Sequence, residues 1–168
     1  IDNTTVAVGG AIWFEGKLFE SIEMGKNFNI LVIHSGFAHN TKVAVENVQN
    51  KRKNRPDFVH KLFSRVGEIS RGGRKALSEG NLRKVGELMS QNHQLLRDLG
   101  VSTPKLDAIV EHCLSAGAWG SKLTGAGMGG CAIAIGEKPT LHGLLEDFTS
   151  HGVQCFLSRV ENELENEQ

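Results

Sequence analysis

Residues 121–130 of this chain read Ser-Lys-Leu-Thr-Gly-Ala-Gly-Met-Gly-Gly, and they run straight into the apolar segment 131–135. Glycine accepts positive φ angles and lets a ligand approach the backbone, so such a run can expose successive N–H donors to an anion. A single glycine would favour a tight hairpin turn between two buried strands. Several glycines that follow Lys122 and Thr124 favour instead a loop beside a phosphate group.

The run also fits the pattern Gly-x-Gly-x-x-Gly, which carries meaning only in its structural context. A dinucleotide-binding turn opens a helix, whereas this one opens a strand-like segment. A protein kinase carries its lysine, catalytic loop and Asp-Phe-Gly motif downstream of its glycine loop, and no such series follows residue 130. A Walker A loop ends in Gly-Lys-Ser/Thr, but residues 130–132 are Gly-Cys-Ala. The sequence therefore predicts a phosphate loop of some other kinase architecture.

Length and charge limit the classes of protein. The chain has 168 residues, enough for one domain with a single core. Its 19 acidic and 19 basic residues balance, so no net charge favours nucleic acid or an anionic membrane as a partner. No apolar stretch approaches the roughly 20 residues of a membrane span. The three cysteines favour reduced core thiols in an intracellular protein. We expect a cytoplasmic location, with a peroxisome-like organelle as the alternative.

Apolar periodicity predicts strands at both ends of the chain and helices between them. Residues 5–24 fit a hairpin that turns at Glu15-Gly16, and residues 28–33 fit a central strand. Three or four helices fill residues 41–116, and the chain then continues as strand, glycine loop, strand, helix and strand. This order predicts an α+β fold, in which a mostly antiparallel sheet packs on helices that cover one face.

Local signals add detail to the helical region. Asn40 or Thr41 fits the N-cap of the first helix. The pair Gly72-Gly73 predicts a kink or break in the following helix. After the last strand, the acidic tail 161–168 is predicted to fray.

A few polar side chains qualify as candidate functional residues. Asp2 lies in a loop position before the first strand, where an isolated aspartate is usually just solvated. Asn92 lies within an apolar helical stripe, where an unpaired amide would cost about 1–3 kcal/mol, so we expect a backbone or ligand partner for it. The neighbouring His93 is predicted to face away from the stripe into solvent, and the charged run 51–53 is predicted to be a solvated helix end. No His or Cys residues show metal-ligand spacing.

Several segments together resemble one family. They are Ile-Asp-Asn-Thr at 1–4, Asn-Thr-Lys at 40–42, Asn-His-Gln-Leu-Leu at 92–96 continuing to Leu-Gly-Val-Ser at 99–102, and the glycine run. Their order resembles the C-terminal half of the mevalonate kinase family, within the GHMP superfamily of small-molecule kinases. The resemblance covers residues 1–158 and implies one domain over 1–160, with the end of a preceding N-terminal domain at about 1–25.

The resemblance implies transfer of the γ-phosphoryl group of ATP, with Mg²⁺, to the primary hydroxyl of mevalonate, a step toward isoprenoids and sterols. Asp2 matches the catalytic aspartate of the family, and Asn3 and Thr41 match substrate-binding positions. The segment from Thr124 through Gly125 and Ala126 to Gly127 matches the motif that supports the phosphates. Val6-Ala7 and Met128 depart from the residues that relatives often carry, which leaves local substrate contacts open.

The resemblance also implies that much of the active site lies outside these residues. The chain begins without an initiator methionine, and we expect it to be a fragment that lacks the ATP-binding loop, the catalytic lysine and the acidic Mg²⁺ ligand of the family. No metal ligand is expected in this chain, whose partners would be the missing N-terminal domain and, as an option, a second copy in a homodimer. The alternatives are a homoserine, phosphomevalonate or sugar kinase, or a non-catalytic regulatory module of the same fold.

Overall fold

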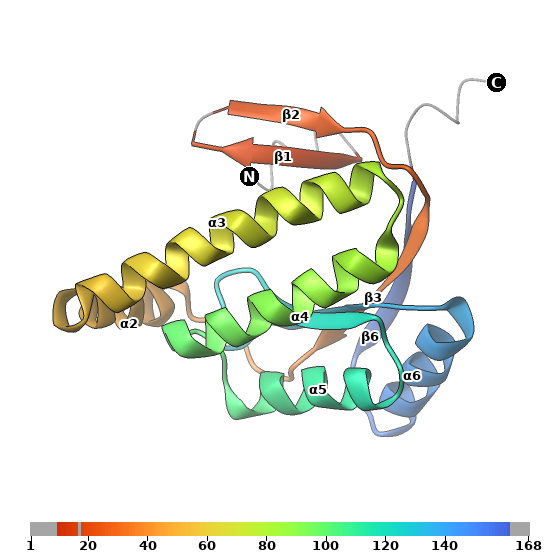
Figure 1. The fold of residues 1–168 in the computed structure, drawn as a ribbon. Coiled ribbons are helices and arrows are strands. Elements are labelled where there is room, and N and C mark those ends of the chain that lie inside the picture. Colours follow the sequence, from red (N-terminus) through yellow and green to blue (C-terminus); the bar gives the residue numbers. More distant parts are fainter. Residues whose placement is uncertain (1–9, 17, 162–168) are drawn as a thin grey trace.

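The fold begins with a hairpin and ends with a strand of a second sheet, as Figure 1 shows. The structure is a computed structural model, and it describes residues 10–16 and 18–161. Asp2 and Asn3 lie outside these residues, as does the tail from residue 162. The elements in chain order are β1 (Ala11–Glu15), β2 (Leu18–Ile22), β3 (Phe28–His34), α2 (Thr41–Asn54), α3 (Pro56–Ser78), α4 (Leu82–Leu99), α5 (Pro104–Ser115), β4 (Gly120–Thr124), β5 (Cys131–Ile135), α6 (Lys138–Ser150) and β6 (Cys155–Val160).

The strands form two antiparallel sheets. β1 and β2 pair with each other, and Gly16 adopts a φ of 65° in the turn between them. The second sheet has the order β4-β5-β3-β6, and each neighbouring pair in it is antiparallel. The central position of β3 confirms the strand predicted at 28–33. The α+β class with a mostly antiparallel sheet is confirmed as well.

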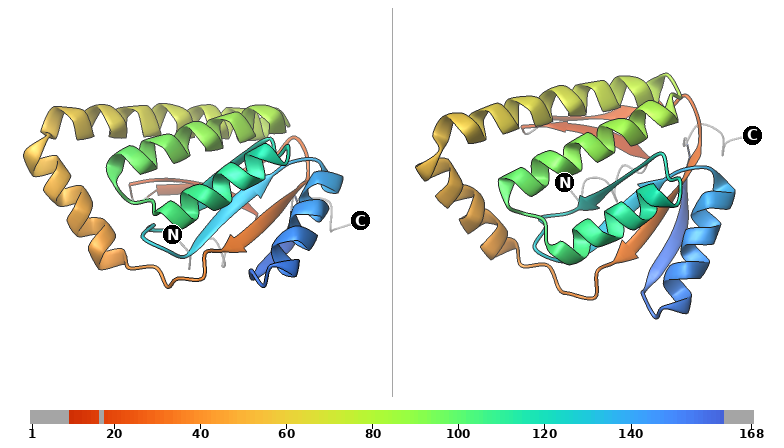
Figure 2. Two further views of the ribbon diagram at one scale, coloured as in Figure 1. Left: turned by 90° about the horizontal axis from the view of Figure 1, so that it is seen from below. Right: turned by 60° about the horizontal axis from the view of Figure 1, so that its bottom comes forward.

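One face of the four-stranded sheet carries the main core. Alternate residues point to this face because side chains along a strand alternate between the two faces. Leu31 and Ile33 of β3 are fully buried there, and they pair with Ala134 and Ala132 of β5. Helices α5 and α6 cover this face, as Figure 2 shows. Their core residues are Leu106, Ile109, Val110, Cys113, Leu141, Leu144 and Phe148. The prediction that helices cover only one face is wrong. Ile30 of β3 and Ile135 of β5 lie on the opposite face, where they pack with Ala76 of α3 and Val85 of α4.

The predicted break at Gly72-Gly73 is wrong. Helix α3 runs without interruption from Pro56 to Ser78. A Cβ on Gly72 would lie 3.4 Å from Leu88 of α4, whereas a Cβ on Gly73 would meet nothing within 4 Å. The absence of a side chain at Gly72 thus lets α4 pack closely against α3, and packing holds the helix straight despite two residues of low helix propensity.

Two glycines bring α4 directly against β4. A Cβ on Gly86 would lie 2.5 Å from the carbonyl oxygen of Trp119, and a Cβ on Gly120 would overlap the backbone of Gly86. Backbone therefore contacts backbone at this crossing, which fixes the position of β4, and hence of the glycine loop after it, relative to the helix.

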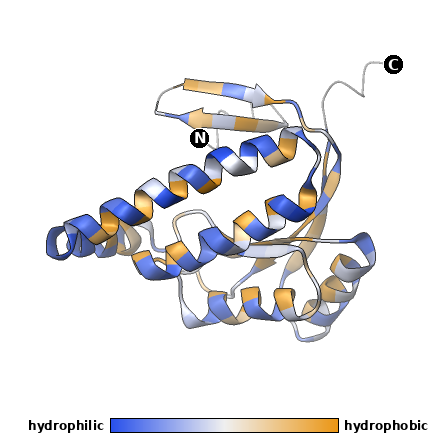
Figure 3. Cartoon of the chain, viewed as in Figure 1, coloured by the Kyte–Doolittle hydropathy of each residue, from blue (hydrophilic) through white to orange (hydrophobic). Residues whose placement is uncertain are grey.

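Hydropathy follows this arrangement. In Figure 3 the helices alternate between hydrophobic and hydrophilic residues along their length, while β3 of the larger sheet is mainly hydrophobic. Such alternation is typical of helices that bury one stripe against a core. Within the described part of the chain, no helix combines the length and the apolar character that crossing a membrane requires.

Candidate functional site

The glycine run forms the connection between β4 and β5, which pair as a hairpin. Its backbone is left-handed at every position except one: the φ angles are 76° at Gly125, 84° at Gly127, 55° at Met128, 119° at Gly129 and 78° at Gly130. Residues other than glycine rarely adopt such angles, which explains the glycine content. The segment is thus a hairpin connection, but one far wider than a tight turn, and its place beside a phosphate group stays a prediction.

Two other segments of the chain hold this loop in place. The N–H of Met128 donates to the carbonyl of Val101 at 2.8 Å, and the N–H of Gly130 donates to the carbonyl of Phe37 at 2.9 Å. A Cβ on Gly127 would lie 2.2 Å from the Val101 oxygen, and one on Gly129 would lie 2.5 Å from the carbonyl oxygen of Ala38. Gly127 and Gly129 are therefore required by close backbone contact as well as by φ.

The first part of the loop carries N–H groups without a backbone partner. Among the described residues, no backbone carbonyl accepts from the N–H groups of Gly125, Ala126 and Gly127. Gly125 is exposed, Ala126 is half-buried and Gly127 is buried. Successive N–H groups in a left-handed turn form an anion-binding concavity. This geometry suits a phosphate oxygen, and it coincides with the residues that the sequence suggested for phosphate support.

Helix α2 begins beside the loop. Asn40 is its N-cap, because the Asn40 side-chain oxygen accepts from the N–H of Val43 at 3.1 Å. Thr41 is exposed. The side-chain amide of Asn47 donates to the Gly100 carbonyl at 3.4 Å and lies 3.7 Å from the sulfur of Met128. The structure thus brings the start of α2, with Thr41, to the side of the glycine loop.

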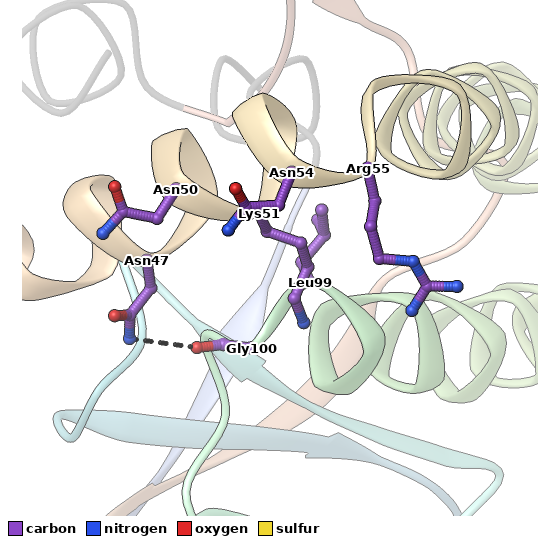
Figure 4. Close-up of a pocket in the computed structure, with 7 residues that line it drawn as sticks. All are labelled: Asn47, Asn50, Lys51, Asn54, Arg55, Leu99 and Gly100. Carbon is purple, nitrogen blue, oxygen red and sulfur yellow. Dashed lines mark hydrogen bonds between the residues drawn. The ribbon is translucent and has the colours of Figure 1, made fainter.

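A groove of about 390 Å³ separates α2 from the end of α4 (Figure 4). Lys51 extends into it from α2, and its ammonium donates to the carbonyl of Asp98 at 2.5 Å. A cation at this position satisfies a carbonyl of the last helical turn and interacts favourably with the helix dipole. The prediction that the run 51–53 is simply solvated is therefore wrong for Lys51. Besides Lys51, the residues that line the groove are Asn47, Asn50, Asn54, Arg55, Leu99 and Gly100.

A smaller pocket of about 160 Å³ lies between α3, α4 and β4. Asn92 and Lys122 both line it. Asn92 is only 8% exposed, and among the described residues no fully buried side-chain nitrogen or oxygen atom lacks a hydrogen-bond partner. Burial lowers the pKa of Lys122, which within the same residues has no acidic partner. The structure gives no backbone partner for Asn92 in the described part, and this pocket holds a buried amide beside a half-buried lysine.

His93 is not solvated, contrary to the prediction from the sequence. The residue is 1% exposed, and its ring extends from α4 toward α5 and β4. The N–H of Leu123 donates to Nδ1 at 3.3 Å, and Nε2 lies 3.1 Å from Oδ1 of Asp107. Asp107 comes from the first turn of α5, 14 residues further along the chain. The helical pattern of α4 alone contains no signal of this partner, which is why the burial was missed.

Comparison with known proteins shows what this region is similar to. Residues 74–154, which include the glycine loop, match the family model described as GHMP kinases C terminal. The chain is 37% identical over 140 residues to a mevalonate kinase of Pyrococcus horikoshii and 30% identical over 173 residues to one of Arabidopsis thaliana. These matches cover 80% and 95% of this chain but only 42% and 44% of the relatives.

Solved structures extend the likeness to the whole fold. The mevalonate kinase of L. major in complex with R-mevalonate superposes with a TM-score of 0.90 at 27% identity, covering 96% of this chain and 52% of that one. The Methanococcus jannaschii mevalonate kinase superposes with a TM-score of 0.76 at 30% identity, covering 95% and 49%. The resemblance to the C-terminal half of mevalonate kinases is therefore confirmed, and the chain spans about half the length of these relatives.

Sequence reasoning located the glycine loop but missed the buried contacts that support it. The unusual glycine content could be recognised directly, whereas the contact of His93 with Asp107 and Leu123 joins residues from three elements. Among the described residues, no group of three or more His, Cys, Asp or Glu side chains gathers as a metal site.

Proposed function

We propose that the complete protein containing this chain is a mevalonate kinase, which transfers the γ-phosphoryl group of ATP to the primary hydroxyl of mevalonate. The observation that carries the proposal is the glycine loop with its three N–H groups that lack a backbone acceptor in the described part of the chain. Support also comes from the names of the relatives, and from a fold that matches the L. major enzyme bound to R-mevalonate. The same reaction provides a precursor for isoprenoids and sterols.

Each site residue has a distinct role in this proposal. The hydroxyl oxygen of mevalonate attacks the γ-phosphorus, the bond from that phosphorus to the bridging oxygen of ADP breaks, and the carboxylate of Asp2 accepts the hydroxyl proton. Asn3 and Thr41 orient the acceptor. Thr124 and the N–H groups of residues 125–127 stabilise charge on the phosphate oxygens. Bound Mg²⁺ would neutralise part of the phosphate charge, and we place its ligands outside this chain.

The same proposal assigns the parts of the chain to domains. β1 and β2 form a sheet separate from the four-stranded one, which supports assigning residues up to about 25 to a preceding N-terminal domain and the remainder up to 160 to the GHMP domain. The N-terminal domain would be the main partner of this chain. A cytoplasmic location and a homodimer are further parts of the proposal, which fractionation and the mass of the complete protein in solution would test.

The test uses the complete protein with ATP and a panel of acceptors: mevalonate, phosphomevalonate, homoserine and galactose. We expect turnover with mevalonate and at least a hundredfold lower kcat/KM with the others. Asp2→Asn should abolish turnover, and Thr41→Ala should reduce it at unchanged stability. If the protein prefers another acceptor, the proposed substrate is that acceptor and not mevalonate. If Asp2→Asn leaves turnover unchanged, a non-catalytic module is favoured.

A further inference from the structure

Beneath the glycine loop, His93 joins the loop to α5. Its Nδ1 accepts from the N–H of Leu123, which is two residues before Gly125. A ring nitrogen that accepts from a backbone N–H carries no proton, so the proton of the neutral imidazole is on Nε2 and is donated to Asp107 Oδ1 at 3.1 Å. Burial of the ring lowers its pKa, which agrees with a neutral form.

The carboxylate of Asp107 has two further contacts. Its Oδ1 accepts from the hydroxyl of Ser102 at 2.6 Å, and its Oδ2 lies 3.2 Å from Nε of Arg97. The carboxylate belongs to the first turn of α5, where the helix dipole favours a negative charge. These contacts fix the orientation of the acceptor that His93 uses. A hydrogen-bonded partner of this kind locks both the tautomer and the rotation of an imidazole ring.

The contacts of Asp107 also extend to the second half of the glycine loop. Ser102 follows Val101, and the Val101 carbonyl accepts from the N–H of Met128 at 2.8 Å. Leu123 on one side of the loop and Met128 on the other are thus connected through Asp107: the first through His93, the second through Ser102 and the backbone of Val101. The three N–H groups without a backbone acceptor, at residues 125–127, lie between these two fixed points.

We propose that His93 and Asp107 are positioning residues, which hold the glycine loop in the conformation that receives phosphate. The inference rests on the proposed function and adds residues that do not touch the phosphate themselves. Because positioning supplies much of the catalysis in phosphoryl transfer, release of the loop should reduce the rate even though the overall fold is kept.

The test compares His93→Gln and His93→Phe in the complete protein. Glutamine can reproduce both contacts, since its carbonyl oxygen can accept from Leu123 and its NH₂ group can donate to Asp107, whereas phenylalanine fills the space and makes neither. We expect His93→Phe to lower kcat by at least tenfold, and His93→Gln to remain within threefold of the wild type. His112→Phe is the matched control, because His112 also contacts an aspartate, Asp147 at 2.7 Å, but lies on the exposed side of α5.

Hydrogen exchange separates positioning from general stability. In His93→Phe, the amides of Leu123 and Met128 should exchange at least tenfold faster while those of α6 keep their rates. Equal acceleration throughout the fold, or unchanged exchange at the loop, would overturn the proposal. If His93→Phe does not fold, Asp107→Asn decides by the same measurement. Exchange does not depend on turnover, so a wild type inactive on mevalonate would refute the proposed function and leave this inference to be decided by the amides.

Discussion

At the scale of single residues, Gly125 and Gly127 occupy the same loop under different constraints. Both have a φ near 80°. A Cβ on Gly125 would meet nothing within 4 Å, whereas one on Gly127 would lie 2.2 Å from the Val101 oxygen. The first position requires only an unusual backbone angle. The second also requires space, because the loop lies directly on the connection between α4 and α5.

This difference predicts unequal effects of alanine. Gly125→Ala should lower the free energy of unfolding by about 1–2 kcal/mol, the cost of a left-handed alanine. Gly127→Ala should lower the free energy of unfolding by a further ~1–3 kcal/mol, because the added carbon overpacks the contact with Val101. Urea unfolding of the two variants measures the difference. Equal losses would mean that the Val101 backbone moves away without cost, and would contradict the close contact.

His93 makes stability depend on pH. Its pKa is lowered in the folded chain by burial, against the opposing effect of Asp107, and two cations, Arg97 and Lys122, lower it further. The unfolded chain therefore takes up a proton below about pH 6.5 that the folded chain does not. The stability that the protein owes to a neutral His93 is fully present above that pH. It is lost as the pH falls toward the pKa of His93 in the folded chain.

We expect the free energy of unfolding of the wild type to fall more steeply than that of His93→Gln between pH 6.5 and 5. The difference in slope for one proton is at most about 1.4 kcal/mol per pH unit. Denaturant titrations at several pH values measure it. Parallel curves for the two proteins would show that His93 keeps its ordinary pKa in the fold.

At the scale of elements, the start of α2 carries two neighbouring residues with different roles. Asn40 is structural, and Thr41 is proposed to be functional. Asn40 accepts from the N–H of Val43, whereas within the described residues the Thr41 hydroxyl has no hydrogen-bond partner. Asn40→Ala should therefore cost about 0.5–2 kcal/mol in the free energy of unfolding. Thr41→Ala should change it by less than about 0.5 kcal/mol, as for an ordinary surface substitution. Thermal unfolding of both variants measures the two losses. A larger loss in Thr41→Ala than in Asn40→Ala would assign the cap to Thr41.

Because α3 continues through both of its adjacent glycines, we predict that replacing one of them raises the stability of the protein. Gly73→Ala should raise the free energy of unfolding by about 0.5–1 kcal/mol, because its Cβ meets no neighbour and alanine favours a helix. Gly72→Ala should gain less, since Leu88 lies 3.4 Å from the added carbon. Destabilisation by Gly73→Ala would indicate a helix that bends there in solution.

Much of the architecture could be predicted because its signals are local. The apolar periods of the helices, Pro56 at the start of α3 and the glycines before β5 are recognisable within short windows of sequence. The errors have a common cause: they concern residues whose environment comes from distant elements. Gly72 depends on Leu88, and His93 depends on Leu123, 30 positions away. The loop of the candidate site was therefore predictable, while its support was not.

At the scale of the whole molecule, the chain spans about 42% of the length of its Pyrococcus horikoshii relative. We predict no measurable turnover of ATP with mevalonate by these 168 residues alone, because the proposed mechanism needs groups from the preceding domain. A coupled assay of ADP release measures this, with the complete protein as the positive control. Turnover by the isolated chain that disappears on Asp2→Ala would contradict the prediction.

The crossing of Gly86 and Gly120 has a mechanical consequence. With no side chain between them to act as a cushion, α4 and β4 cannot slide or tilt past each other without a collision of main-chain atoms. The space between the two elements admits no larger residue. Any side chain at position 86 or 120 would force α4 and β4 apart and displace the strand that leads to Thr124.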